Sequence, residues 1–436
     1  MRNLTRSALM RGVVSGAVTA LTVACTGVGS SSPTPATPQT LRSGVTLTWM
    51  SALDNQANQD ARNSQIARFR EQQPGIQVER QRVEGYDAKL VAAFAANTPP
   101  DLYTTVRANV TSQATRGYPQ ALDDLIKRDR FGLTEFYPTS YEQYRVNGKL
   151  YALSYDFPNR CLFANMTAFD EAGIKRPPST WKDEAWTWDV FRTAMEGLQR
   201  RRGPQGAWAF DANRGLRSWM PWVWNNGADL LSKDGREVIL NEAAGVEALT
   251  FLQDMIVRYN VSPPQAGRQA PLGQFTRGQL LVYENAQTAI GQMRLDVGHS
   301  FTWDMVPIPK GKGQRAASGG GSGYSIAATS QNREEAWAFF KHLMTRESHT
   351  TWMTVVGAMV PFKALVESPT FLVAPPAHMS IFGEGAAILR LDPTAPRWTE
   401  IEPVLNDELD KLWTGAVPPK QVADTIKRLI DPMLKG

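Results

Sequence analysis

The chain has few of the residues that cross-link secreted folds or hold metal ions. Of its 436 residues, two are cysteine, Cys25 and Cys161, and four are histidine. The histidines never adopt ligand spacing with a cysteine or with one another, so the sequence predicts no metal site. Their positions are His299, His342, His349 and His378.

Charge is also sparse and nearly balanced. Charged residues make up 20% of the chain, and the formal net charge is +5. Three arginines, Arg2, Arg6 and Arg11, lie in the amino-terminal segment, and without residues 1–24 the net charge falls to about +2. The composition therefore gives no reason to expect a nucleic-acid partner.

Two further signals of common function classes are missing. The glycine-rich run "SGGGSGYS" is not followed by Gly-Lys-Ser/Thr, so it does not predict a nucleotide-binding loop. The run is better explained by close backbone approach or by a turn. There is no internal repeat, and hydrophobic residues make up 42% of a chain long enough for two domains.

The first 43 residues differ from the rest of the chain. Residues 1–24 begin with the basic stretch "MRNLTRSALMR" and continue with the short apolar run "GVVSGAVTALTVA", the layout of a secretory signal peptide. Residues 25–43 then give "TGVGSSSPTPATPQTLRSG" after the cysteine, a Ser/Thr/Pro-rich composition that predicts a flexible tether.

The stretch "LTVAC" resembles a bacterial lipoprotein box, with Thr22 where the pattern prefers leucine. By this resemblance Cys25 is lipidated and becomes the first residue of the mature chain. The protein is then exported and anchored by lipid to the cell membrane, facing the periplasm or the cell exterior. Cys161 is left unpaired, and we expect it to be a small buried hydrophobic residue.

From residue 44 onward the hydrophobic pattern predicts a globular α/β fold. "GVTLTWM", "IQVERQRV" and "DLYTTV" read as strands, and they alternate with helices in "ANQDARNSQIARFREQQPG" and "YDAKLVAAFAAN". This order predicts an open sheet whose ligands bind at the carboxyl ends of its strands. Further on, "EVIL" predicts a short strand before a helix, residues 333–345 a helix, and the last ~35 residues two helices separated by a Gly-Pro turn.

Five motifs in order resemble the extracellular solute-binding proteins of ABC importers, in the sugar-binding branch typified by maltose-binding protein. They are "YDAKLVAAFAANTPPDLY", "VNGKLYALSYD", "LFANMTAFDEAGIKRPPSTW", "FTRGQLLVYENAQ" and "WDMVPIPKGKGQ". Ala164 and Ser154 depart from the family pattern, as does "LLVYEN", which lacks the common Ala-Met.

The resemblance implies a periplasmic-binding-protein-like type II fold, with two α/β lobes joined by a hinge and a ligand cleft between them. Lobe one would take residues 44–155 and 306–350, and lobe two residues 156–305 and 351–436. Hinge motion would close the lobes over the ligand.

The resemblance also implies a function: a monomeric receptor, without cofactor, delivers a sugar to the permease subunits of an ABC importer. Two alternatives remain open, namely the same fold binding another solute such as a glycerophosphodiester or polyamine, and a secreted glycoside hydrolase. Clustered arginines or lysines near the cleft would favour a phosphate-bearing ligand, whereas an aromatic-rich cleft would favour a sugar. A hydrolase needs two carboxylates on opposite sides of a cleft. No motif in the sequence indicates such a pair, so we expect no catalytic residues.

Sugar recognition uses aromatic faces for C–H surfaces and carboxylates, amides or guanidiniums for hydroxyls. By resemblance we expect ligand contacts from loops, strand ends and the tryptophan-rich segment. These residues are Trp49, Asp54, Thr105, Arg107, Asp156, Trp219, Trp222, Asn285, Gly320, Ser322, Arg397 and Trp398.

The segment "LRSWMPWVWNNGADLL" predicts a helix whose three tryptophans cannot share one face. Trp219 and Trp222 are about 60° apart and Trp224 points away from both. We expect Trp219 and Trp222 to face the ligand, Trp224 to pack in the core, and Asn226-Gly227 to end the helix. Pro221 then implies a helix that begins only one or two residues before it.

Overall fold

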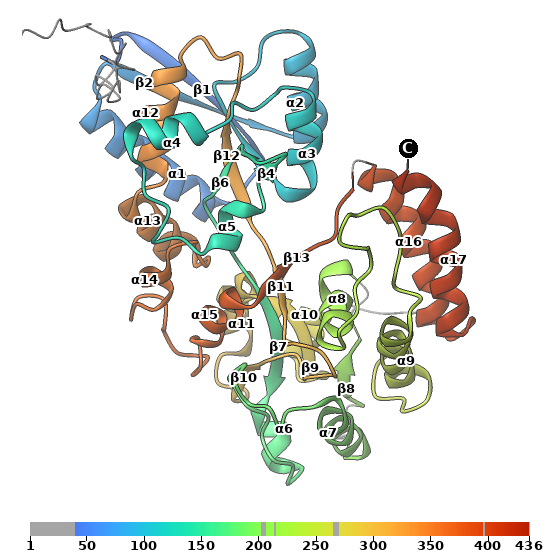
Figure 1. Cartoon of the computed structure of the whole chain (residues 1–436). Helices are drawn as coiled ribbons and strands as arrows, with labels where there is room; N and C mark the ends of the chain where they lie inside the picture. Colours follow the sequence, from blue (N-terminus) through green and yellow to red (C-terminus); the bar gives the residue numbers. More distant parts are fainter. Residues whose placement is uncertain (1–39, 202–205, 213–214, 265–269, 396, 436) are drawn as a thin grey trace, which may run out of the picture. The chain divides into compact units, whose positions relative to one another are not determined.

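The first sheet follows the β-α-β-α-β order expected from the sequence (Figure 1). A computed structural model describes residues 40–201, 206–212, 215–264, 270–395 and 397–435. The opening elements are β1 (Val45–Ala52), α1 (Gln56–Gln72), β2 (Ile76–Val83), α2 (Tyr86–Ala95) and β3 (Leu102–Val106). The sheet has the order β2-β1-β3-β12-β6, completed by β12 (Ser322–Ile326) and β6 (Leu153–Ser154).

Strands β1, β2 and β3 are parallel, so their carboxyl ends meet at one edge of the sheet. β12 runs antiparallel to both β3 and β6. Its pairing brings residues near position 322 to the edge that carries the ends of β1 and β3, because Ser322 lies opposite Val106. Sequence-distant segments therefore share the edge at which ligands bind in open α/β sheets.

The second sheet has the order β10-β7-β9-β8. Its strands are β7 (Arg160–Asn165), β8 (Trp208–Asp211), β9 (Leu280–Ala286) and β10 (Trp303–Val306). The helices next to it in sequence are α6 (Met166–Glu171), α7 (Trp188–Arg200), α8 (Leu216–Asn225), α9 (Ala243–Val257), α10 (Pro271–Thr276) and α11 (Ile290–Val297), with a short 3-10 turn at Gln287–Ala289. The strand expected in "EVIL" is absent there: Val238 forms only an isolated bridge with Leu231.

The remaining elements are short, apart from the helices that follow β12 and those at the carboxyl terminus. In the first half they are α3 (Arg107–Thr115), α4 (Asp123–Asp129), α5 (Pro138–Glu142), β4 (Arg145–Val146) and β5 (Lys149–Leu150). In the second half they are β11 (Ala317–Gly319), α12 (Arg333–Leu343), α13 (Arg346–Val356), α14 (Lys363–Val366), α15 (Ile381–Ala387), β13 (Leu389–Leu391), α16 (Trp398–Trp413) and α17 (Pro419–Leu434).

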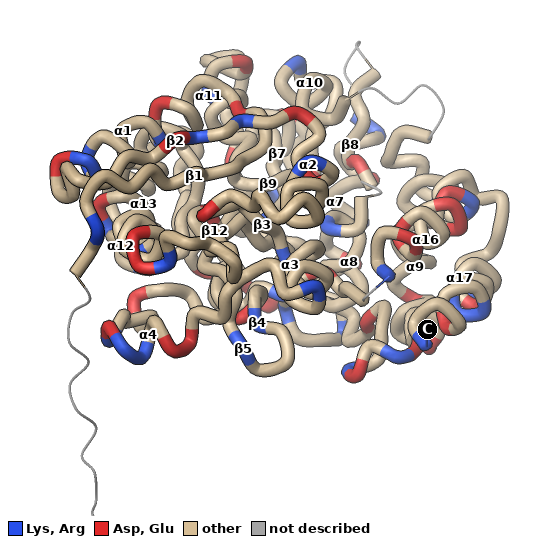
Figure 2. Tube along the Cα trace, turned by 90° about the horizontal axis from the view of Figure 1, so that it is seen from above, with Lys and Arg blue, Asp and Glu red and all other residues tan. Residues whose placement is uncertain are grey.

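Several helix predictions are confirmed. α12 buries the predicted stripe of Ala336, Phe339, Phe340 and Leu343, and α16 and α17 are the two expected carboxyl-terminal helices. In Figure 2 acidic and basic residues are mixed along α4, α12 and α17, as the balanced charge implies. Cys161 is buried and free, as expected.

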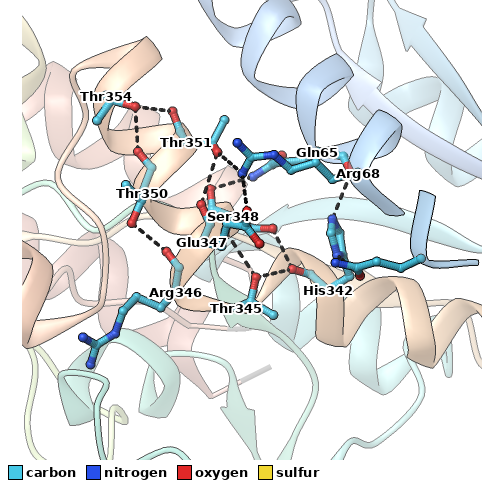
Figure 3. Close-up of polar contacts among 11 residues, drawn as sticks. Gln65, Arg68, His342, Thr345, Arg346, Glu347, Ser348, Thr350, Thr351 and Thr354 are labelled. Carbon is cyan, nitrogen blue, oxygen red and sulfur yellow. Dashed lines mark hydrogen bonds and ion pairs between the residues drawn. The ribbon is translucent and has the colours of Figure 1, made fainter. Parts of the chain in front are cut away.

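Polar side chains join α1 to α13 (Figure 3). Gln65 Nε2 donates to Ser348 O at 3.0 Å, and Arg68 Nη1 lies 3.0 Å from Glu347 Oε1. His342, near the end of α12, donates from Nε2 to Gln65 O at 2.9 Å. These bonds lie on helices that cover the first sheet and hold its flanking layer together.

A second histidine, His349, is sealed inside the same layer. Its ring nitrogens lie 3.0 Å from Thr345 O and 3.3 Å from Ser154 O, and the residue is 1% exposed. Burial penalises the imidazolium, which lowers the pKa of His349 from its ordinary value of 6.5 to about 4. His349 is therefore held neutral against β6.

This burial predicts acid sensitivity. Because the unfolded chain binds the proton more readily than the folded chain, the free energy of unfolding falls as pH drops below about 6.5 and stops falling near pH 4. Between pH 7 and 5 the loss should be about 2 kcal/mol, and His349→Gln should remove it. Urea denaturation at each pH measures this difference. His299→Gln, at an exposed position, is the matched control and should keep the wild-type pH dependence; an unchanged dependence in His349→Gln would contradict the assignment.

Candidate functional site: two polar pockets joined by a hinge

A pocket of about 250 Å³ lies at the carboxyl ends of β1 and β3; we call it the strand-end pocket. Three of the predicted ligand residues, Asp54, Thr105 and Ser322, line it together. Tyr86 and Tyr155 add two aromatic rings to the lining. The Tyr86 hydroxyl donates to Thr104 O at 2.5 Å, which fixes its ring at the pocket edge.

Asp54 is surrounded by arginines inside this pocket. Its Oδ2 accepts from Arg62 Nη1 at 2.6 Å and from Arg80 Nη2 at 2.5 Å, while Arg82 Nη1 lies 3.8 Å from Oδ1. Burial and the neighbouring Arg62 charge lower the pKa of Arg80. The Asp54 carboxylate thus faces three guanidiniums, of which Arg62 lines the pocket together with a second carboxylate, Asp87.

Arg62 also has a packing role. Its guanidinium carbon lies 5.0 Å from the ring centre of Trp352, 5.3 Å from that of Tyr155 and 5.5 Å from that of Trp49. Such cation–π contacts hold the guanidinium in a fixed place. The positive charge is therefore preorganised before any ligand binds.

A second pocket, of about 420 Å³, draws its lining from both sheet regions; we call it the arginine pocket. Arg107 comes from the start of α3 beside the first sheet, Arg160 from β7 in the second sheet, and Arg217 from the start of α8. Asp392 and Trp398 approach from the segment between β13 and α16. Arg107 and Trp398, both predicted ligand residues, therefore lie in one pocket.

Asp392 connects the two sides of the arginine pocket. Its carbonyl accepts from Arg107 Nε at 3.1 Å, and its carboxylate Oδ2 accepts from Arg217 Nε at 2.5 Å. The guanidinium of Arg160 pairs instead with Glu284, which also bonds the Ser218 hydroxyl. Burial lowers the pKa of Arg107, whose Nε donates to a backbone carbonyl.

The local structure of α8 explains how Arg217 is presented. α8 begins at Leu216, five residues before Pro221, which is earlier than the sequence predicted. Pro221 has no N–H to donate to Arg217 O, one turn earlier, so a helix interior would normally lose a bond there. The Ser318 hydroxyl of β11 donates to Arg217 O at 2.6 Å and replaces it. β11 thus holds the first turn of α8 in place.

The chain crosses between the sheets beside these pockets. Residues 154–160 and 317–322 run side by side: Tyr155 N donates to Ser322 O at 3.0 Å, and Ser322 N donates to Asp156 Oδ1 at 2.6 Å. A Cβ added to Gly321 would lie 1.9 Å from Asp156 O, so glycine is required there. Burial raises the pKa of Asp156 to about 6. Asp156 and Gly320 thus lie in the crossing segments that join the two pockets.

A third crossing segment packs against the first. Phe157 N donates to Met359 O at 2.8 Å, and Met359 N donates to Gln287 Oε1 at 2.8 Å. Three chain segments therefore connect the two sheets, and rotation about such segments is the usual hinge motion of two-lobed proteins.

The other predicted residues line neither of the two pockets. Trp49, Trp219 and Trp222 are 0%, 0% and 1% exposed, so their side chains belong to the core of this structure, and their contact with a ligand stays a prediction. Asn285 lies on β9, where its Nδ2 donates to the Tyr283 hydroxyl at 3.4 Å. Arg397 is exposed and pairs with Glu400 on the same helix turn.

Trp219 and Trp222 are buried because neighbouring elements enclose α8. Trp222 lies 5.3 Å from Phe191 of α7, 5.8 Å from Phe210 of β8 and 5.6 Å from Phe251 of α9, measured between ring centres. Trp224 is buried as expected, and its Nε1 donates to Asp229 Oδ1 at 3.1 Å. The predicted helix end is confirmed, with Asn226 as the C-cap and Gly227 at φ +84°.

Sequence reasoning missed Arg62, Arg160, Arg217 and Asp392. Arg217 stands two residues before Trp219 in the tryptophan-rich segment, so the sequence does place a charged group next to the residues predicted to contact the ligand. The role of Asp392 could not be predicted from the sequence, because its partners Arg107 and Arg217 are 285 and 175 positions away.

In residues 40–201, 206–212, 215–264, 270–395 and 397–435, no cluster of three or more His, Cys, Asp or Glu side chains could hold a metal ion. Within the same residues no helix combines the length and apolar character that crossing a membrane requires. Cys25 and the residues before it lie outside the described residues.

Two α/β units with polar pockets at strand ends, joined by crossing segments, define a two-lobed solute-binding protein. The bacterial extracellular solute-binding protein family matches residues 64–379, and the chain belongs to this family. The predicted type II periplasmic-binding-protein-like fold is thereby confirmed, as the solved structures below also show.

Relatives cover most of the chain. It is 24% identical over 392 residues to the sn-glycerol-3-phosphate-binding periplasmic protein UgpB of Pectobacterium atrosepticum, covering 83% of this chain and 85% of that protein. The sugar-binding protein MalE of Xanthomonas citri has a similar structure (TM-score 0.78, 20% identity, 89% of this chain and 97% of that one). An ABC substrate-binding protein of Listeria monocytogenes in complex with cycloalternan also has a similar structure (TM-score 0.77, 21% identity, 90% of this chain and 99% of that one).

The burial of the α8 tryptophans predicts that they contribute to the stability of the fold. Trp219→Ala and Trp222→Ala should each lower the free energy of unfolding by about 3–5 kcal/mol, the range for emptying a buried tryptophan site. Chemical denaturation measures this loss, and Trp219→Phe should recover part of it. A Trp219→Ala protein as stable as wild type would show that the ring is not part of the core.

Proposed function

We propose that the chain is the substrate-binding lipoprotein of an ABC importer and captures a sugar, an oligosaccharide, between its two lobes. The observation that carries the proposal is the pair of polar pockets on either side of the crossing segments. Volumes of about 250 and 420 Å³ together suit a small-molecule ligand. The named function of the Xanthomonas citri relative and the ligand of the Listeria monocytogenes relative support a sugar.

The pocket linings supply the chemistry that a sugar needs. Tyr86, Tyr155 and Trp398 offer ring faces to C–H surfaces. Thr105 and the arginines offer hydrogen-bonding groups for hydroxyls. The proposed cycle has lobe one (residues 44–155 and 306–350) closing on lobe two (residues 156–305 and 351–436), and the permease receiving the closed form. Ligand shifts that equilibrium only by binding the closed form more tightly.

The arginines favour a second candidate, a solute that carries a phosphate, such as a glycerophosphodiester. Arg107, Arg160 and Arg217 line the arginine pocket, and Asp54 in the strand-end pocket is outnumbered by guanidiniums. Guanidiniums bind phosphate bidentately, and a relative is named for glycerol 3-phosphate. A polyamine is disfavoured because Asp54 and Asp392 are already held by arginines.

We propose binding without catalysis. The carboxylates of the arginine pocket, Asp392 and Glu402, come from the same segment, and Asp392 is held by Arg217. A hydrolase would need two carboxylates on opposite sides of its substrate. The proposed receptor works as a monomer, because one chain contributes both pockets.

The first test is thermal-shift screening of the mature chain, without residues 1–25, against mono- and oligosaccharides, sn-glycerol 3-phosphate and glycerophosphocholine. A ligand at 100 times its Kd should add about 2.7 kcal/mol of stability. Stabilisation by a saccharide supports the sugar proposal. Stabilisation only by the phosphate compounds would replace it with the second candidate, and slow consumption of a ligand would contradict the receptor proposal.

The second test separates the two candidates through charge. Arg107→Gln combined with Arg217→Gln should weaken a phosphate ligand by about 100-fold or more, and salt should weaken the wild-type complex. A neutral sugar should lose far less affinity and show little salt dependence. Isothermal titration at two ionic strengths gives both quantities, and Arg390→Gln, outside both pockets, is the matched control.

Lipid anchoring is proposed from "LTVAC" alone. Cys25→Ser in the full chain should prevent acylation, because the thiol that carries the lipid is lost. Incorporation of labelled palmitate and membrane fractionation in a bacterial host check this outcome. Cys161→Ser is the control. Equal labelling of the Cys25→Ser protein would refute the anchor.

A further inference from the structure

A third pocket, of about 630 Å³, shares no lining residue with the two pockets described above. It lies between the start of α7, the length of α9, the end of α8 and residues 310–312. Its floor includes two partly exposed aromatic residues, Trp188 and Phe251, and we call it the aromatic pocket.

The arginine pocket and the aromatic pocket lie at opposite ends of α8. Residues 215–218 line the arginine pocket, and the C-cap Asn226 lines the aromatic pocket. α8 has ten residues, so the two ends are about 15 Å apart. The aromatic pocket is thus a separate surface of the second sheet region.

The aromatic floor is a layered stack. The ring centres of Trp188 and Phe251 are 4.5 Å apart with an interplanar angle of 22°, and Trp222 lies behind them, 5.6 Å from Phe251 at 28°. Trp222 is buried and wedged against Phe191 and Phe210. The tryptophan that the sequence assigned to the ligand therefore supports the two rings that reach the surface.

The walls of the aromatic pocket are fixed by backbone contacts. Trp188 N donates to Lys310 O at 3.1 Å, and Lys312 N donates to Asn226 Oδ1 at 3.2 Å. A Cβ added to Gly311 would lie 2.8 Å from Asn225 O, and one added to Gly313 would lie 2.3 Å from Gly227 N. The loop can rest on the end of α8 only because these residues are glycines, and the pocket is formed in advance of any ligand.

The charges around the aromatic pocket are mutually compensated. Glu247 Oε1 lies 2.5 Å from Lys312 Nζ, and Asp254 Oδ2 lies 3.5 Å from Arg258 Nη1. Lys310 pairs with Glu184, and Asp189 Oδ1 lies 3.7 Å from Arg192 Nη2. Neither a phosphate nor an amine finds a free counter-charge of the kind present in the arginine pocket. Flat rings rimmed by neutralised polar groups suit a neutral polyhydroxylated ligand, whose C–H faces stack on aromatics while its hydroxyls bond the rim.

We propose that the aromatic pocket is a second binding site, for a pyranose unit of a neutral saccharide chain, in which the sugar face lies on Trp188 and Phe251. The site is independent of which solute the two hinge-side pockets take. It is open on a fixed surface of one lobe, so a polysaccharide too long to be enclosed between the lobes can occupy it.

Native affinity electrophoresis of the mature chain tests the proposal. The probes are gels containing soluble starch, mixed-linkage β-glucan, xylan or galactomannan, compared with a plain gel. At least one polysaccharide should retard the wild-type protein, and Phe251→Leu should raise its dissociation constant about tenfold or more, because a flat stacking ring is lost. Leucine keeps apolar contact with Trp222.

Thr250→Arg provides a second variant that leaves the rings in place. Thr250 lines the pocket and its hydroxyl bonds Val246 O one helical turn back, so arginine there should fill the pocket and remove retardation without loss of stability. Thr354→Arg is the matched control, because Thr354 makes the same bond to Thr350 O on α13, and it should be retarded like wild type.

Two results would overturn the proposal: wild-type mobility unchanged by all four polysaccharides, or Thr250→Arg and Phe251→Leu both retarded as strongly as wild type. The stabilisation by small solutes described under the proposed function reports the hinge-side pockets. It should persist in Thr250→Arg, so failure of the surface site and failure of the proposed function are distinguishable.

Discussion

The arrangement of both sheets depends on the close packing of the chain where it passes from one to the other. Residues 317–322 lie directly on residues 154–160, and Gly321 meets Asp156 O so closely that no side chain fits. This contact places Ser322 and the end of β12 at the edge of the first sheet and β11 beside α8. The contact between these two segments therefore fixes the positions of the strand-end pocket and the arginine pocket.

The two ends of α8 contribute polar residues to two different pockets. Its first turn is held by Ser318 because Pro221 cannot bond Arg217 O, and this presents Arg217 to Asp392. Its last turn ends at Gly227 under the 310–313 loop and carries Asn226 to the aromatic pocket. Between these ends its tryptophans are enclosed by α7, α9 and β8, so the helix body is core while its two ends line the arginine pocket and the aromatic pocket.

The three pockets differ in how their charged side chains are paired. Guanidiniums outnumber carboxylates around Asp54, and Arg107 in the arginine pocket bonds a backbone carbonyl, which leaves its charge available to a ligand. The aromatic pocket has its charges paired and its rings exposed. Guanidiniums that hold a hydroxyl can equally hold a phosphate, which is why the hinge-side pockets suit two solute classes and the aromatic pocket suits one.

Local rules were sufficient for the elements. Alternating and helical periodicities predicted the first five elements, and Asn226-Gly227 predicted the end of α8, because each depends on residues within one or two turns. The order of five motifs predicted the fold, since motifs spread over most of the chain constrain its whole topology.

Accessibility and pairing were decided by the tertiary structure alone. Helical spacing correctly showed that Trp219, Trp222 and Trp224 cannot share a face, but it could not show that all faces of α8 are covered. The cover comes from Phe191, Phe210 and Phe251, which belong to three other elements. Asp392 likewise meets Arg107 and Arg217 across most of the chain length. The sequence determines the direction in which a side chain leaves its own helix. Which residues it contacts depends on the packing of segments that are far apart in the sequence.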